Sequence, residues 1–266
     1  MDISIFWAFV ASLGTWGLTA LGAAIVVFFK APKQSLLNLM LGFSAGVMIA
    51  ASFWSLLQPA IEQAEQVLNI PSHIVVTLGF LFGATFIWLS DKAVTHSILK
   101  ANASEDNIIS KLNRVIMLIM SITLHNIPEG LAVGVAFGLL KDNFNYSSFM
   151  GALSIAIGIG LQNFPEGAAV SLPLRREGYS RKKSFFYGQL SAVVEPISAI
   201  IGAALVTTIK TILPFALSFA AGAMIIVSVH ELIPECQKNK SEQPYTATIG
   251  IIVGFSLMML LDVMLG

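Results

Sequence analysis

The sequence has few charged residues and a single cysteine, and both shortages narrow what the chain can be. Only 11% of its 266 residues are charged, whereas about 25% is usual in soluble domains. Hydrophobic residues make up 56% of the chain and the mean hydropathy is +0.80, so we expect an integral membrane protein. The one cysteine, Cys236, excludes an intrachain disulfide framework and a thiolate metal cluster. The balance of 15 basic and 15 acidic residues gives no argument for nucleic acid as a partner.

Eight apolar runs are long enough to cross a bilayer as helices, which takes about 20 residues each. The first run has no basic segment before it and continues to Phe29, which is too long for a cleaved signal peptide. Helices are favoured over a barrel, whose strands would alternate over about ten residues. We therefore predict one all-α transmembrane domain over residues 1–266. The predicted spans are 4–29, 37–61, 73–91, 115–140, 149–173, 185–209, 212–234 and 245–265.

Basic residues gather on one side of this predicted membrane domain. The connectors after the second, fourth and sixth spans hold only Lys141 and Lys210, so the other side holds 15 − 2 = 13 of the Lys and Arg residues. Positive charge is retained on the cytoplasmic side of membranes. Both termini are therefore predicted to face outward, and the clean division supports a count of eight spans.

Two pairs of similar segments within the chain indicate inverted repeats. AGVMIAAS at 45–52 in the second span shares Ala, Gly, Met, Ile and Ser with AGAMIIVS at 221–228 in the seventh. The fourth and fifth spans also resemble each other, and both pairs join spans that run in opposite directions. The simplest arrangement is three helices, a central pair and three inverted helices, a 3+2+3 pattern of the kind found in secondary transporters. Chance similarity between helices rich in small residues is the alternative.

Polar residues recur inside two of the most apolar runs. LHNIPEGLAVGV (124–135) lies in the fourth span, and LQNFPEGAAVSL (161–172) repeats its pattern in the fifth, 162 − 125 = 37 residues later. At about 100° per residue, the three polar side chains of each motif fall within one arc of a helix. Another glutamate lies near the middle of the sixth span. The candidate metal ligands are His125, Asn126, Glu129, Gln162, Asn163, Glu166 and Glu195.

Three glutamates at the depth of the bilayer centre need compensation, because each ionised acid there costs roughly 2.5 to 3.5 kcal/mol. The interiors of these spans contain no Lys or Arg, which excludes a salt bridge and leaves protonation of the acids or a cation from outside. Carboxylate, imidazole and amide ligands together suit Zn²⁺, Fe²⁺ or Mn²⁺. The alternative is that these groups only hydrogen-bond to one another and hold the bundle together.

Three further residues are weaker metal-ligand candidates. Met48, inside the second span, could offer a thioether, although a methionine there usually serves packing. His230 and Glu231 belong to the segment HELIPE near the cytoplasmic end of the seventh span. This segment is similar to the HExxH motif of metalloproteases, but Pro234 occupies the position of the second histidine. An accessory metal site and an ordinary solvated helix end both remain open for it.

The paired motifs HNIPEG and QNFPEG, in the fourth and fifth of eight spans, resemble the ZIP (Zrt/Irt-like) divalent metal transporters, and among them the bacterial GufA-like branch. The resemblance covers essentially the whole chain. It implies a 3+2+3 helix arrangement and a binuclear site between the fourth, fifth and sixth helices, formed by the seven candidate ligands above with Met48 at its edge. Many relatives have histidine at the place of Gln162 and a histidine-rich loop between the third and fourth spans, and this chain has neither.

Residues and resemblance together predict a transporter that moves Zn²⁺ foremost, and also Fe²⁺, Mn²⁺, Cd²⁺ or Co²⁺, into the cytoplasm by alternating access. No enzymatic activity and no cofactor are expected, because the metal is the substrate. The expected partners are the metal ions and membrane lipid, a homodimer is one assembly open to the chain, and the expected location is a bacterial cytoplasmic membrane. A passive divalent-cation channel that uses the same site is the alternative, and an intramembrane metalloprotease is a less favoured one.

Overall fold

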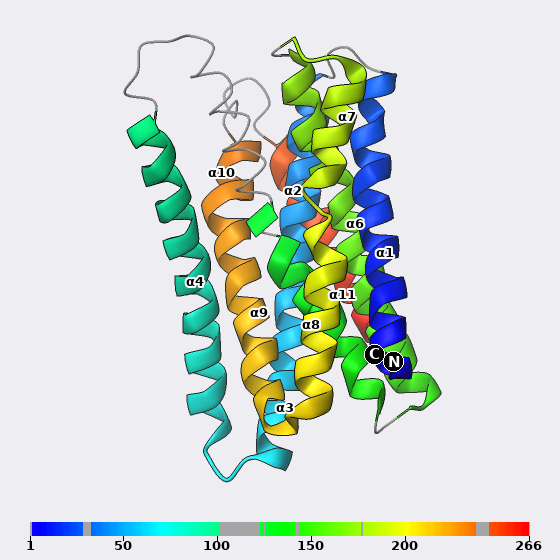
Figure 1. Ribbon diagram of the computed structural model, residues 1–266, viewed down its shortest axis with the longest axis vertical. Coiled ribbons are helices and arrows are strands. Elements are labelled where there is room, and N and C mark those ends of the chain that lie inside the picture. Colours follow the sequence, from blue (N-terminus) through cyan, green and yellow to red (C-terminus); the bar gives the residue numbers. More distant parts are fainter. Residues whose placement is uncertain are drawn as a thin grey trace.

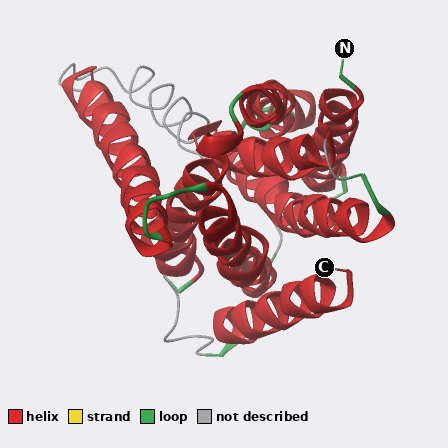
Figure 2. Cartoon of the chain, turned by 90° about the horizontal axis from the view of Figure 1, so that it is seen from below, coloured by secondary structure: helices red, strands yellow, loops and turns green. Residues whose placement is uncertain are grey.

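The described part of the protein is a bundle of helices. The computed structural model describes residues 2–28, 33–101, 123–124, 126–141, 144–176, 178–237 and 245–265, and all regular structure within these ranges is helical (Figure 2). Most of the helices run along one long axis (Figure 1). Seven of these helical stretches are long and apolar enough to cross a membrane. An all-helical membrane architecture, as expected from the sequence, is therefore present.

The helix bounds agree with seven predicted spans to within a few residues at most ends. The fourth predicted span, 115–140, is helical from 126 to 138, whereas 115–122 and His125 lie outside the described residues. The elements are α1 (Ile3–Ala24), η1 (Ile25–Val27), α2 (Gln34–Ala51), η2 (Ser52–Leu57), α3 (Gln58–Val67), α4 (Ser72–Ala101), the helix over 126–138, η3 (Leu139–Lys141), α6 (Tyr146–Arg176), α7 (Arg181–Leu190), α8 (Val194–Thr208), η4 (Lys210–Ile212), α9 (Leu213–Val227), η5 (Ser228–Leu232), α10 (Ile233–Cys236) and α11 (Thr246–Leu265).

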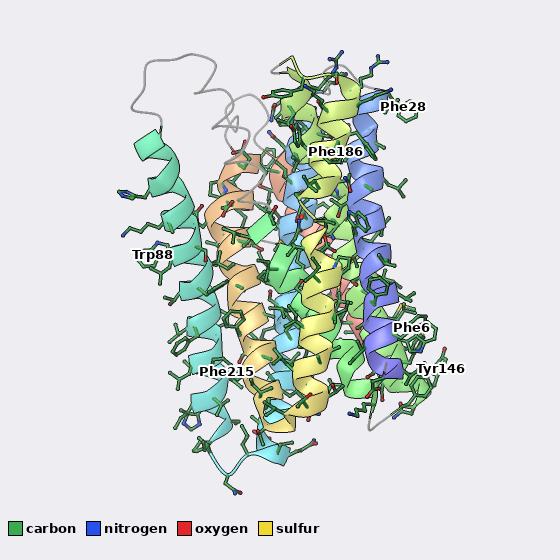
Figure 3. All side chains as sticks on the ribbon, viewed as in Figure 1. Phe6, Phe28, Trp88, Tyr146, Phe186 and Phe215 are labelled. Carbon is green, nitrogen blue, oxygen red and sulfur yellow. The ribbon has the colours of Figure 1, made fainter. Side chains whose placement is uncertain are left out.

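Large apolar side chains cover the outside of the bundle. Phe28 and Trp88 are exposed and point away from the helices (Figure 3). Tyr146 lies near one end of the bundle and Phe186 near the other (Figure 3), as aromatic residues do at membrane interfaces. Such a surface suits contact with lipid.

The first helix begins at an acidic cap. A side-chain oxygen of Asp2 accepts hydrogen bonds from the Ser4 amide (3.3 Å) and the Ser4 hydroxyl (3.0 Å). The bond from the Ser4 amide holds the pKa of Asp2 below its usual range. The other carboxylate oxygen of Asp2 lies 3.2 Å from the ammonium of Lys141. This contact joins the start of α1 to the end of η3, the short helix that follows the helix over 126–138.

Glycines bring one set of helices, which we call the first helix group, into backbone contact. This group comprises α1, the helix over 126–138, α6, α7 and α8. A Cβ at Gly167 of α6 would overlap the carbonyl oxygen of Thr19 in α1. A Cβ at Gly134 would overlap the carbonyl oxygen of Ala199 in α8. Close approach of this kind is typical of small residues between membrane helices.

A second helix group, α2 to α4 and α9 to α11 with the η segments between them, has its own glycine seams. A Cβ at Gly46 would overlap Ile251 of α11, and one at Gly222 of α9 would overlap Phe80 of α4. Between the two groups the contact is different, because Gly158 of α6 faces the side chain of Met258 in α11 rather than its backbone. The backbone seams named here therefore lie within the groups.

The two similar octapeptides, at 45–52 and 221–228, have the same local structure. Each ends in a serine that donates to the carbonyl four residues earlier, Ser52 to Met48 (2.7 Å) and Ser228 to Met224 (2.9 Å). A π-helix begins at each serine, η2 in one case and η5 in the other. π-Helices are rare and occur often at functional sites, so chance is a poor explanation for two at matched positions.

The glycine seams predict a position-dependent effect of adding one methyl group. Gly83→Ala should lower the stability of the protein by about 1 to 3 kcal/mol, because overpacking costs this much and the new Cβ would overlap the Phe219 carbonyl oxygen. Gly14→Ala should be neutral or stabilising, because nothing lies within 4 Å of a Cβ there and alanine favours a helix by up to about 1 kcal/mol over glycine. Melting temperatures of the purified variants test this, and equal values would contradict the proposed seam.

Candidate metal site

The motif residues of three predicted spans meet inside the first helix group. Six of the seven predicted ligands are described, and each is at most 6% exposed. They come from the helix over 126–138, from α6 and from the first turn of α8. The seventh, His125, lies outside the described residues. The six are Asn126, Glu129, Gln162, Asn163, Glu166 and Glu195.

The two amides of the α6 motif each bind a glutamate on a different helix. The side-chain nitrogen of Gln162 donates to Glu129 Oε1 at 2.8 Å. The side-chain nitrogen of Asn163 donates to Glu195 Oε1 at 2.9 Å. Both carboxylates are fully buried. The two hydrogen bonds therefore offset part of the free-energy cost of burying them, which no lysine or arginine in these spans offsets.

The sixth span is broken at the site. The span predicted over 185–209 is present as a membrane-spanning stretch over Arg181–Thr208, and within it a turn at 191–193 separates α7 from α8. The break leaves the Ser191 carbonyl free to accept from the Asn126 amide at 2.8 Å. Pro196, in the first turn of α8, is the sequence signal for such a break. Proline has no N–H group, and the first turn of a helix tolerates it because the N–H groups there have no intrahelical acceptor. Broken spans are typical of transporter binding sites.

Two hydroxyl groups that were not predicted from the sequence also contact the glutamates. Thr15 of α1 donates to Glu195 Oε2, the second oxygen of that carboxylate. Ser44 of α2 donates to Glu166 Oε1 at 2.6 Å. Both residues are buried in apolar helices. In the sequence they resemble other buried hydroxyl residues such as Ser12, so no local signal distinguishes them.

Three oxygens at the site have no hydrogen-bond donor among the described residues. They are Glu129 Oε2, Gln162 Oε1 and Asn163 Oδ1. A buried acceptor without a donor costs about 1 to 3 kcal/mol, and all three are oxygens of the kind that bind divalent cations. No group of three His, Cys, Asp or Glu side chains within the described ranges is close enough to hold a metal ion. An ion bound by these residues would therefore need the amide oxygens as well as the carboxylates.

The comparisons with known proteins identify the family. A sequence profile described as "ZIP Zinc transporter" matches residues 96–262. The chain belongs to the ZIP zinc transporter family. It is 36% identical to human "Zinc transporter ZIP11" over 99% of this chain and 98% of that protein. It is 35% identical to "Zinc transporter GufA" of Myxococcus xanthus over 97% and 98%, and 33% identical to "Zinc transporter ZIPB" of Bordetella bronchiseptica over 99% and 83%.

Family membership confirms the resemblance seen in the paired motifs, including its GufA-like character. As a ZIP protein the chain is not an enzyme, which confirms that prediction and removes the metalloprotease alternative for HELIPE. His230 is exposed in η5, and Glu231 beside it is half-buried. Met48 is fully buried in the main apolar cluster, which also contains Ala132 of the fourth span. The accessory ligand roles of these residues stay predictions.

This ZIP chain also contains a cavity of about 580 Å³, lined by Ser55, Glu62 and Asp262 among others. Asp262 Oδ1 accepts from Ser55 at 2.7 Å and from Ser154 of α6 at 3.5 Å. Its other oxygen, Oδ2, is buried and has no donor among the described residues. The sequence analysis missed Asp262, although an acid one turn before the end of an apolar span is a visible signal.

The bond from Thr15 predicts a stability difference between two hydroxyl deletions in one helix. Thr15→Val should destabilise the metal-free protein by about 1 to 3 kcal/mol, because it removes a donor from a buried carboxylate while keeping the side-chain shape. Ser12→Ala is the matched control, since Ser12 is also buried in α1 but donates only to its own helix, at the Phe9 carbonyl. Melting temperatures in metal-free detergent solution measure the difference. A Thr15→Val protein as stable as Ser12→Ala would show that the bond contributes nothing.

Proposed function

We propose that this ZIP protein is a secondary transporter that carries Zn²⁺ into the cytoplasm, with Fe²⁺, Mn²⁺, Cd²⁺ and Co²⁺ as further substrates. The observation that carries the proposal is a set of buried oxygens on Glu129, Gln162 and Asn163 that have no donor among the described residues. They lie between the helix over 126–138, α6 and α8, and the predicted spans that contain these helices hold no Lys or Arg in their interiors. The relatives named above are zinc transporters, which supports Zn²⁺ as the first substrate.

The metal would bind among the seven predicted ligands. Glu129, Glu166 and Glu195 supply the negative charge, and His125, Asn126, Gln162 and Asn163 supply neutral nitrogen and oxygen ligands. Amide oxygens bind transition metals more weakly than thiolates or several imidazoles do. A site of moderate strength suits transport, because an ion held too tightly is not released.

Alternating access would arise from movement of the first helix group against the second. The first group carries the glutamates, and its contact with the second at Gly158 is made with a side chain. A 3+2+3 inverted repeat is supported by the matched seams of Gly46 and Gly222 and by the two π-helices that follow the similar octapeptides. The proposed order is the first three spans, the central pair formed by the helix over 126–138 and α6, and the last three spans.

The charge distribution supports an orientation with both termini outside a bacterial cytoplasmic membrane. The cavity with Glu62 and Asp262 would then open toward the outer side, where its acids attract cations. HELIPE would lie at the cytoplasmic end, beside the outlet. The passive channel remains the rival function, and saturable uptake at low metal concentration without single-channel currents would exclude it.

Removing one charge at a time tests the site. Glu129→Gln and Glu166→Gln should each reduce Zn²⁺ uptake into proteoliposomes by about tenfold or more, because even indirect partners of metal ligands cost 10- to 100-fold in affinity when removed. Glu65→Gln is the control, since Glu65 is exposed on α3 and bonded to Ser72. Wild-type uptake by both site variants would exclude the proposed site.

The amide at Gln162 predicts broad metal selectivity. Gln162→His should raise the uptake of Zn²⁺ relative to Mn²⁺, because imidazole favours zinc whereas oxygen ligands suit manganese. The measurement is competition of Zn²⁺, Fe²⁺, Mn²⁺, Cd²⁺ and Co²⁺ against a labelled tracer ion in proteoliposomes. Gln66→His, at an exposed position of α3, should leave the order of preference unchanged. An unchanged order in Gln162→His as well would mean that this residue does not set selectivity.

A further inference from the structure

Ser44 lies on the face of α2 opposite to its glycine seam. Gly42 and Gly46 pack against the backbone of α11, where added Cβ atoms would overlap the carbonyl oxygens of Ala247 and Ile251. Ser44 is two residues from each glycine, which turns its side chain by about 200° around the helix. It is fully buried there and donates to Glu166 Oε1 at 2.6 Å.

This hydrogen bond crosses from the second helix group to the first. Glu166 precedes Gly167, whose close contact with Thr19 fixes this part of α6 to α1. The bonds of Gln162 with Glu129 and of Asn163 with Glu195, in contrast, join helices of the first group only. Away from the glutamates, the bond from Ser154 of α6 to Asp262 of α11 also crosses, but it is long at 3.5 Å.

The crossing bond is therefore a specific polar link between the group that carries the site and the group beside it. Hydrogen bonds to charged acceptors are shorter and about twice as strong as neutral ones, and burial strengthens them further. We propose that Ser44 is a positioning residue that holds the Glu166 carboxylate against α2 in this conformation and must release it before the first group can move. This inference rests on the proposed function in one respect, which is that the movement of the first group is taken to be part of transport.

Reactivity of a buried cysteine between the groups tests the proposal without any metal. Cys236→Ala removes the native thiol, and Met258→Cys then places a reporter opposite Gly158, at a position that is 0% exposed. Ile87→Cys is a second reporter within the second group, because Ile87 is buried on α4, which packs mainly on α9. The rate of thiol labelling of each reporter in metal-free detergent solution reports how often its surroundings open.

Ser44→Ala should speed labelling at Met258→Cys by about tenfold, which is the shift expected from losing a hydrogen bond to a charged group. It should leave labelling at Ile87→Cys unchanged. Ser44→Thr, which keeps the hydroxyl, should restore slow labelling, and Ser52→Ala should have no effect, because Ser52 bonds only within its own helix. In a Glu166→Ala background, Ser44→Ala should add nothing, since its partner is already absent.

Three results would overturn the proposal. They are unchanged labelling at Met258→Cys, equal acceleration at both reporters, which indicates general loosening of the fold, and a full additional effect of Ser44→Ala in the Glu166→Ala background. Zn²⁺ uptake by the intact chain is measured separately. If the intact chain fails to take up Zn²⁺ but Ser44→Ala accelerates labelling, the proposed function is refuted and the role of Ser44 stands. If the intact chain takes up Zn²⁺ but Ser44→Ala leaves labelling unchanged, the role of Ser44 is refuted and the proposed function stands.

Discussion

The structure depends on keeping three carboxylates inside a membrane bundle whose spans at the site contain no Lys or Arg in their interiors. Amide and hydroxyl donors do this work: Gln162 for Glu129, Asn163 and Thr15 for Glu195, and Ser44 for Glu166. Neutral donors stabilise a buried carboxylate less completely than a cation does, because they carry no net charge. A salt bridge with lysine or arginine would neutralise the charge and leave no reason for a metal ion to enter. The absence of basic residues is therefore a condition for a cation site rather than a defect of the core.

The glycine seams follow from the same constraint. Polar side chains are short relative to the spacing of ordinary helices, so helices that carry leucine at their contacts would lie too far apart for these hydrogen bonds. Gly130 next to Glu129 and Gly167 next to Glu166 remove the side chain where the backbone of a neighbouring helix approaches. The close approach brings the carboxylates within reach of donors on other helices and buries them within the protein. Packing and electrostatics thus select the same positions.

The sequence predicted those features that rest on composition and periodicity. The apolar runs predicted seven of the spans to within a few residues at most ends. The repeated motif pointed to Glu129 and Glu166, because a polar residue in a long apolar run is conspicuous. The break at 191–193 was missed, since hydrophobicity does not change across it and only Pro196 marks it. Thr15 and Ser44 were missed because their roles depend on which helix lies opposite, and periodicity within one helix does not contain that information. The π-helices were missed for a similar reason, although the similar octapeptides before them were recognised.

The question of why the second motif begins with glutamine has a structural answer in its two polar atoms. Gln162 donates through its nitrogen to Glu129, and its oxygen has no donor in the part of the chain that the structure describes. One amide can therefore stabilise a carboxylate through its nitrogen while its oxygen stays available to a cation, and Asn163 has the same arrangement beside Glu195. A neutral imidazole also has one donor and one acceptor, but its ring fixes them on opposite sides and its nitrogen binds transition metals more strongly. At the proposed metal site, glutamine would thus keep the network of donors intact while binding the ion more weakly than histidine would, which favours release over tight binding.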